Sequence, residues 1–154
     1  VAAAIAGSVV LVPTYLAELQ VRRATTGWDE NLARAFKRLD RAQSLNPLDA
    51  EPALVEGIIA LQVGDLRRAR EGLLEASDRD PDAWLAPLEL GLIASAQGDR
   101  AAARRRLLSA QRRNPRSPVI AQALRRLASR PMTLAEAAAA LTQESARSTG
   151  RSAR

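Results

Sequence analysis

The sequence predicts an all-α protein: an α-solenoid of antiparallel helical hairpins, preceded by a transmembrane helix. Three observations lead to this prediction. A set of small and turn-forming residues recurs with a period of about 34 residues, a length that suits one helical hairpin. Strand-forming residues are scarce after Val12, and only 3% of all residues are aromatic. Finally, positions 1–17 carry no charge.

The uncharged N-terminal segment has the composition of a membrane span. As a helix, residues 1–17 would be about 26 Å long, slightly short of the roughly 30 Å hydrocarbon core, and extension to Val21 would close the gap. Arg22 and Arg23 follow as a basic flank. We expect residues 1–23 to form a transmembrane helix whose beginning lies upstream of this sequence. A helix buried against a partner and an export signal are the alternatives, and no basic region precedes the segment as an export signal requires.

Residues 28–47 are predicted to form an amphipathic helix that corresponds to the second half of a hairpin. Its apolar residues recur at spacings of three and four: Leu32, Ala35, Phe36, Leu39 and Ala42. The first helix of that hairpin would fall on residues 16–29, which lack the repeat pattern. We therefore expect a half repeat in this region.

Two complete hairpins are predicted at residues 50–81 and 84–115. Each has a small residue where its helices approach, a glycine at the turn, two alanines in the second helix and a proline at the end. These residues are Gly57, Gly64, Ala69, Ala76 and Pro81 in the first hairpin, and Gly91, Gly98, Ala103, Ala110 and Pro115 in the second. The prediction is specific because the whole set recurs in register.

Capping residues agree with these boundaries. Asp65 and Asp99 follow the turn glycines and are placed to cap second helices, while Asp49 and Asp82 are placed to cap first helices. Residues 118–144 are predicted to form two further helices, the second opening with a capping box at Thr133, and these helices would close the end of the stack. Residues 145–154 are rich in Ser and Arg and are predicted to be disordered.

The repeat resembles the tetratricopeptide repeat family. The resemblance implies a concave binding surface made by the first helices, with most of its side chains aliphatic. The residues expected there are Glu51, Leu54, Ile58, Leu61, Leu85, Leu88, Leu92 and Ser95. Such a surface suits an apolar or amphipathic helix, supplied either by another protein or by a membrane domain of the same polypeptide.

Catalysis is not expected from this segment. The absence of Cys and His removes thiol nucleophiles, imidazole bases and Cys/His zinc sites, and we expect no catalytic residue, cofactor or metal. The charge is unevenly placed: residues 18–99 hold 15 acids and 10 bases, whereas residues 100–154 hold 13 bases and 2 acids. This basic part is either a solvated face or a surface attracted to anionic lipids. Nucleic-acid binding is not expected, because no aromatic residues lie among the arginines.

The order of the parts resembles the C-terminal end of bacterial O-antigen ligase/polymerase-like membrane proteins. An apolar helix leads into a half repeat that ends Leu-Asn-Pro-Leu-Asp-Ala-Glu-Pro, and two tetratricopeptide-like hairpins follow. The resemblance implies an accessory region of a glycan-transferring protein of the bacterial inner membrane, and it places no catalytic residue on this chain. The alternative is a free-standing, single-pass membrane-anchored adaptor. The basic residues after the apolar segment favour a cytoplasmic position for the repeats.

Overall fold

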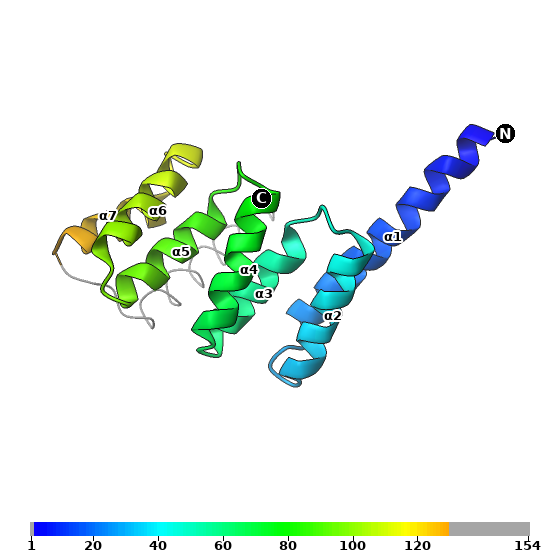
Figure 1. Ribbon diagram of the computed structural model, residues 1–154, viewed down its shortest axis with the longest axis horizontal. Coiled ribbons are helices and arrows are strands. Elements are labelled where there is room, and N and C mark those ends of the chain that lie inside the picture. The colour runs from blue at the N-terminus through cyan, green and yellow to red at the C-terminus, as the bar shows by residue number, and fades with distance from the viewer. Residues whose placement is uncertain (1, 130–154) are drawn as a thin grey trace, which may run out of the picture. The chain divides into compact units, whose positions relative to one another are not determined.

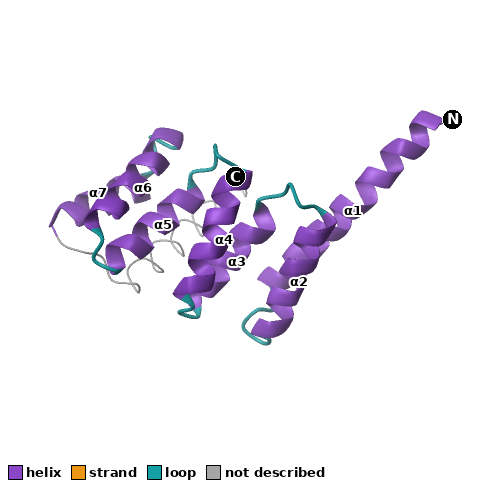
Figure 2. Cartoon of the chain, viewed as in Figure 1, coloured by secondary structure: helices purple, strands orange, loops and turns teal. Residues whose placement is uncertain are grey.

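The chain folds into helices joined by short turns, as Figures 1 and 2 show for the part that is described. The computed structural model describes residues 2–129, with side chains from Thr14 onward. The helices are α1 (Ala2–Thr25), α2 (Leu32–Leu45), α3 (Glu51–Gln62), α4 (Leu66–Arg79), α5 (Leu85–Ala96), α6 (Arg100–Arg113) and α7 (Pro118–Ser129). No strand occurs among these residues, which confirms the all-α prediction for them. The predicted helix after Thr133 and the predicted disordered tail lie outside the described residues.

The period of the sequence repeat is also the period of the helices. Helix α5 begins and ends one full repeat period after α3, and α6 begins and ends one period after α4. Helix α2 precedes α4 by the same interval. The chain divides into two compact units between Asp80 and Pro81, close to the boundary between the two predicted hairpins.

The turns within the two hairpins have the same geometry. Gly64 and Gly98 have φ angles of 81° and 82°, a left-handed conformation that glycine adopts without steric cost. The side chain of Asp65 then accepts a hydrogen bond from the Arg68 amide at 3.0 Å, and that of Asp99 accepts one from the Ala102 amide at 2.8 Å. Both carboxylates satisfy amides that would otherwise lack a partner in the first helical turn.

The first helices begin differently from the prediction. Ala50 and Trp84 are the N-cap residues of α3 and α5, and neither provides a capping side chain. Asp49 lies just before Ala50 and accepts a hydrogen bond from the Glu51 amide at 2.9 Å. Asp49 therefore contributes a capping hydrogen bond from the position before the N-cap residue Ala50, and Asp82 lies two residues before Trp84, the N-cap residue of α5.

Helices α3 and α4 cross at two glycines. A Cβ atom added to Gly72 would lie 2.8 Å from the carbonyl oxygen of Ala53 and 2.9 Å from the amide nitrogen of Gly57. One added to Gly57 would lie 2.7 Å from the Cγ atom of Leu73. Two backbones therefore touch here, with no side chain between them, and only glycine at position 72 permits that approach.

The α5–α6 hairpin keeps one of these two contacts and lacks the other. A Cβ atom on Gly91 would lie 2.9 Å from the Cγ atom of Leu107, as one on Gly57 would lie close to Leu73. The position that corresponds to Gly72 is occupied by Arg106. Helix α7 then extends the core of this unit, which contains Leu88, Leu92, Ala94, Ala103, Leu107, Ala110, Val119, Ile120, Ala123 and Leu127.

Helix α1 takes the place of the first helix that the sequence pattern did not identify. Its residues Ala17, Val21 and Ala24 are 1%, 2% and 0% exposed, and its C-terminal half lies alongside α2 (Figure 1). Helix α2 begins at Leu32, later than predicted, because Asn31 caps it by accepting a hydrogen bond from the Arg34 amide at 2.9 Å. The last turns of the predicted membrane segment thus belong to a helical pair.

No helix in the part of the chain whose side chains are described is long and apolar enough to cross a membrane.

The glycine crossing can be tested with Gly72→Ala. Alanine favours helix by up to about 1 kcal/mol relative to glycine, but here its Cβ would strike backbone atoms that cannot rotate away. We expect the steric clash to outweigh the gain in helix propensity and to lower the free energy of unfolding by on the order of 1–3 kcal/mol. Chemical denaturation measures this change. Glu71→Ala, on the exposed side of the same helix, is the control and should change little; equal effects of the two substitutions would contradict the close crossing.

Candidate functional site

The α3 half of the predicted binding surface is partly open. Leu54 and Ile58 are half-buried, Glu51 is exposed at the start of the helix, and Leu61 is 6% exposed. Their spacing of three and four residues places all four side chains on one face of α3. This face offers two accessible aliphatic residues with a carboxylate at one end.

The α5 half of the predicted surface is closed. Leu88, Leu92 and Ser95 are each 0% exposed, and the two leucines belong to the core shared with α6 and α7. Leu85 is half-buried and packs against that core. A charge introduced at Leu88 would enter the core, so the accessible residues of the predicted surface are those of α3 and Leu85.

The Glu51 carboxylate, at the start of the α3 face, experiences repulsion from two other acidic side chains. Burial raises the pKa of Glu51, and the negative charges of Asp49 and Glu18 raise this pKa further, while Arg22 lowers it. A cationic group of a ligand at this end of the face would offset the repulsion among the three acids. The α3 face therefore combines accessible aliphatic side chains with acidic side chains at its start.

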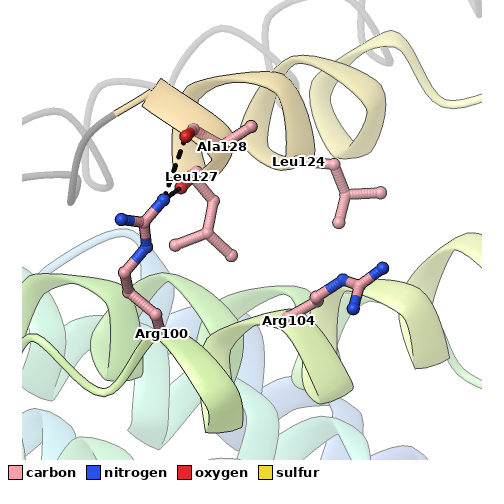
Figure 3. A pocket seen from close by; sticks show the side chains of 5 residues that line it. All are labelled: Arg100, Arg104, Leu124, Leu127 and Ala128. Atoms are coloured by element: carbon pink, nitrogen blue, oxygen red, sulfur yellow. Dashed lines mark hydrogen bonds between the residues drawn. The ribbon is translucent and has the colours of Figure 1, made fainter.

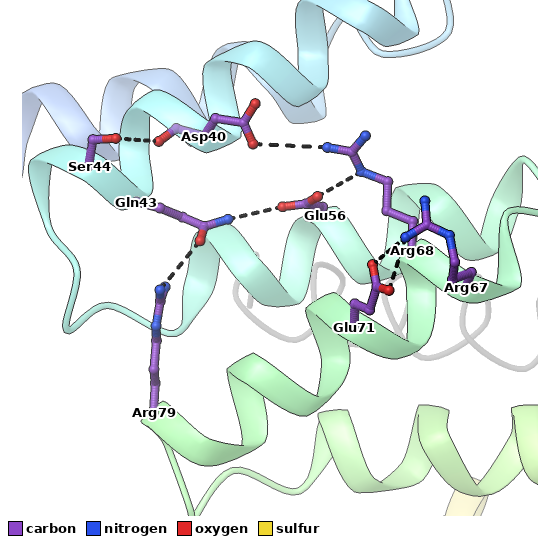
Figure 4. A network of polar contacts seen from close by, with 8 residues as sticks. All are labelled: Asp40, Gln43, Ser44, Glu56, Arg67, Arg68, Glu71 and Arg79. Carbon is purple, nitrogen blue, oxygen red and sulfur yellow. Dashed lines mark hydrogen bonds and ion pairs between the residues drawn. The ribbon is translucent and has the colours of Figure 1, made fainter.

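A polar network joins α2, α3 and α4 beside this face, and Arg68 is its centre (Figure 4). The Arg68 Nε donates to Glu56 at 2.7 Å, and the guanidinium lies 3.7 Å from the centre of the Phe36 ring. Asp40 of α2 forms a longer ion pair with Arg68, at 3.9 Å. Only 30% of the Arg68 side chain is exposed.

The network continues along α2 to the end of α4. Gln43 donates to the second oxygen of Glu56 at 2.9 Å and accepts from Arg79 at 3.3 Å, and Arg79 also donates to the Asp49 carbonyl at 3.0 Å. Burial raises the pKa of Glu56, whereas the hydrogen bond and charge of Arg68 lower it. Glu56 thus holds α3 to a residue on each neighbouring helix and fixes the orientation of the α3 face.

Among the described residues, only Glu89 of α5 has buried side-chain polar atoms without a hydrogen-bond partner. Its side chain is 0% exposed, and neither carboxyl oxygen has a partner. Burial raises the pKa of Glu89 well above its ordinary value, because a charge without a partner is costly away from water. Burial therefore favours the neutral, protonated form of this carboxyl group.

The second unit also presents a basic surface. Residues 100–129 contain nine arginines and no acid. Two of them, Arg100 and Arg104, line a small pocket between α6 and α7. Nothing in the sequence pattern singled out this pocket, because it depends on how α7 packs against α6.

Within the described residues, no group of three or more acidic side chains is placed to hold a metal ion. No protein-family model and no curated protein matches the chain.

Removing the central residue of the polar network tests its contribution. Arg68→Ala would leave the mostly buried Glu56 without its cationic partner and would uncover Phe36. We expect unfolding to become easier by on the order of 1–3 kcal/mol, measured by thermal or chemical denaturation. Arg67→Ala is the matched control, since Arg67 forms an exposed pair with Glu71, and such pairs contribute little. If Arg67→Ala destabilised the protein more than Arg68→Ala, Arg68 would not be the central residue of the network.

Glu89 predicts a specific dependence of stability on pH. Unfolded chains lose the Glu89 proton near pH 4.5, whereas the folded chain keeps it to higher pH, so this residue lowers stability progressively as the pH rises above that value. Glu89→Met removes the carboxyl group at similar size. We expect it to stabilise the protein at pH 7 by on the order of 1–3 kcal/mol, with a smaller gain at pH 4, where the carboxyl group is largely neutral in the unfolded chain as well. Glu71→Met, an exposed control, should show no such pH-dependent gain. A Glu89→Met gain that is equal at both pH values would contradict the buried neutral carboxyl.

Proposed function

We propose that this chain is a membrane-tethered interaction module of the tetratricopeptide type. The observation that carries the proposal is the repetition of one hairpin at a fixed interval, with the same helix lengths, the same left-handed glycine and the same aspartate cap. Repeats of this kind present the side chains of their first helices to a partner. The chain also contains neither Cys nor His, the residues of thiol nucleophiles, imidazole bases and Cys/His zinc sites.

The α3 face is the surface that the proposal assigns to the partner. Leu54 and Ile58 would bury apolar side chains of the partner, and Glu51 would attract a basic residue. An amphipathic helix satisfies both requirements, since apolar residues at every third or fourth position can meet the two aliphatic side chains. The polar network around Arg68 would keep the α3 backbone rigid when such a helix binds.

The tether would be the uncharged segment at residues 1–17. In the favoured version, the chain is the C-terminal accessory region of an O-antigen ligase-like, glycan-transferring protein of the bacterial inner membrane, with the repeats on the cytoplasmic side. The partner is then either another protein or the membrane domain of the same polypeptide. The alternative is a free-standing adaptor with a single membrane helix. The reading frame upstream separates the two: about ten further apolar spans support the first version, and a nearby start codon supports the second.

Site-specific photocross-linking tests the binding face. A photoreactive side chain at Ile58 should give a discrete cross-linked product in cells, and Leu54→Glu should remove it by charging the face. The control position is Leu48, which is 86% exposed and lies before α3. A product of the chain with its own polypeptide would assign the membrane domain as partner. Identical patterns from Ile58 and Leu48 would contradict a binding face on α3.

Flotation with liposomes tests the tether. The whole chain should float with neutral vesicles at high salt, and a form that begins at residue 14 should not, because most of the apolar segment is removed while Ala17, Val21 and Ala24 of the α1–α2 pair are kept. High salt is required because it screens attraction between arginines and lipid headgroups. Equal flotation of both forms under these conditions would contradict the N-terminal anchor.

A further inference from the structure

The end of α7 is bonded differently from the ends of α3 and α5. In α5, the carbonyl oxygen of Ala94 accepts a hydrogen bond from the Asp99 amide at 3.0 Å, directly after the left-handed glycine. One period later, the carbonyl oxygen of Ala128 accepts a hydrogen bond from Nη2 of Arg100 at 3.0 Å, as does that of Leu127 at 2.6 Å (Figure 3). An arginine of α6 thus bonds the last carbonyls of α7, which no later amide of the helix can reach.

The repeat pattern also changes in and after α7. Met132 stands one period after Gly98, and residues with a side chain rarely adopt the left-handed conformation of that glycine. Arg125 stands one period after Gly91. Gly57 and Gly91 are buried where second helices cross α3 and α5, whereas Arg125 is exposed. The Arg125 position of α7 is therefore not covered by a helix as its two counterparts are.

The α5 face is more completely covered than the α3 face. Leu88 and Leu92 of α5 are 0% exposed, whereas Leu54 and Ile58, which stand one period earlier in α3, are half-buried. Within its own unit, α3 packs against the described helices α1, α2 and α4, while α5 packs against α6 and α7. Since α5 has fewer described neighbours in its unit and yet is more buried, these neighbours do not account for all of its cover.

The segment that follows α7 has a composition that suits this cover. Seven of the eight residues 134–141 are alanine or leucine, the residues with the highest helix propensity. Small side chains also let a helix backbone lie close to an aliphatic surface. A helix over residues 134–143 would be about 15 Å long, slightly shorter than the twelve-residue α5.

We propose that residues 134–143 form a helix that lies on the α5 face made by Leu85, Leu88, Leu92 and Ser95, instead of closing the end of the stack beside α7. This contact holds half of the predicted binding surface closed. A partner would gain the α5 face only by displacing the segment, while the α3 face stays accessible. The regulatory consequence rests on the interaction function proposed above, whereas the contact itself does not depend on it.

Pairs of engineered cysteines in the full chain test this contact, because the sequence has no native cysteine. One cysteine replaces Leu85, which is half-buried on α5, and the other replaces each of residues 135–141 in turn. Under mild oxidation, positions spaced three or four apart should form a disulfide about tenfold or more faster than the rest. A docked helix holds such positions at bonding distance, whereas a free segment reaches it only transiently. Circular dichroism of each variant checks that the helices are retained.

Two other anchor positions complete the scan. Arg105→Cys, at an exposed position of α6, is the control and should give slow disulfide formation with every position of the segment. Arg125→Cys tests the alternative place beside α7. Faster reaction with Arg125→Cys than with Leu85→Cys would overturn the proposal, as would equal rates with Leu85→Cys and Arg105→Cys. The cross-link from Ile58 to a partner is expected in either case, so failure of the disulfide scan leaves the proposed binding function of α3 intact.

Discussion

The approach of two helices at a glycine is the contact on which each hairpin depends. At Gly72 the α4 backbone lies against the α3 backbone, with an added Cβ atom only 2.8 Å from the Ala53 carbonyl oxygen. This short separation brings Ala69, Leu73 and Ala76 of α4 into full burial. A core made mainly of alanine and leucine has little side-chain volume, so the helices must lie close together to exclude water. Small residues are thus the cause of the tight hairpin.

The two hairpins solve the same packing problem in different ways. The first places glycine on both helices and adds a polar network, in which Arg68 connects Glu56, Asp40 and Phe36. The second has the glycine–leucine contact of Gly91 and Leu107 but no second glycine, and it extends its core through α7. The consequence for function is that α3 keeps accessible aliphatic side chains, whereas Leu88 and Leu92 of α5 are used within the core.

Much of the fold could be predicted from the sequence because the decisive residues are local. A glycine followed by an aspartate specifies a left-handed turn and a helix cap at adjacent positions, and both hairpins have this pair. The role of α1 could not be predicted, since its buried Ala17, Val21 and Ala24 lie within an apolar segment that has no distinct polar face. Glu89 and Arg68 were missed for a related reason. A glutamate or arginine on a helix is usually exposed. Only tertiary packing determines that Glu89 is buried and that Arg68 lies over Phe36.

The most direct test of this account is a nuclear Overhauser measurement between the α-protons of Gly57 and Gly72. A Cβ atom added to Gly72 would lie only 3.2 Å from the Cα atom of Gly57. The α-protons of the two glycines are therefore close to each other. The account predicts a strong cross-peak between the two glycines, which lie on different helices and are far apart in the sequence. If the spectrum shows helical α3 and α4 but no such cross-peak, the helices do not cross at these glycines and the packing described here is incorrect.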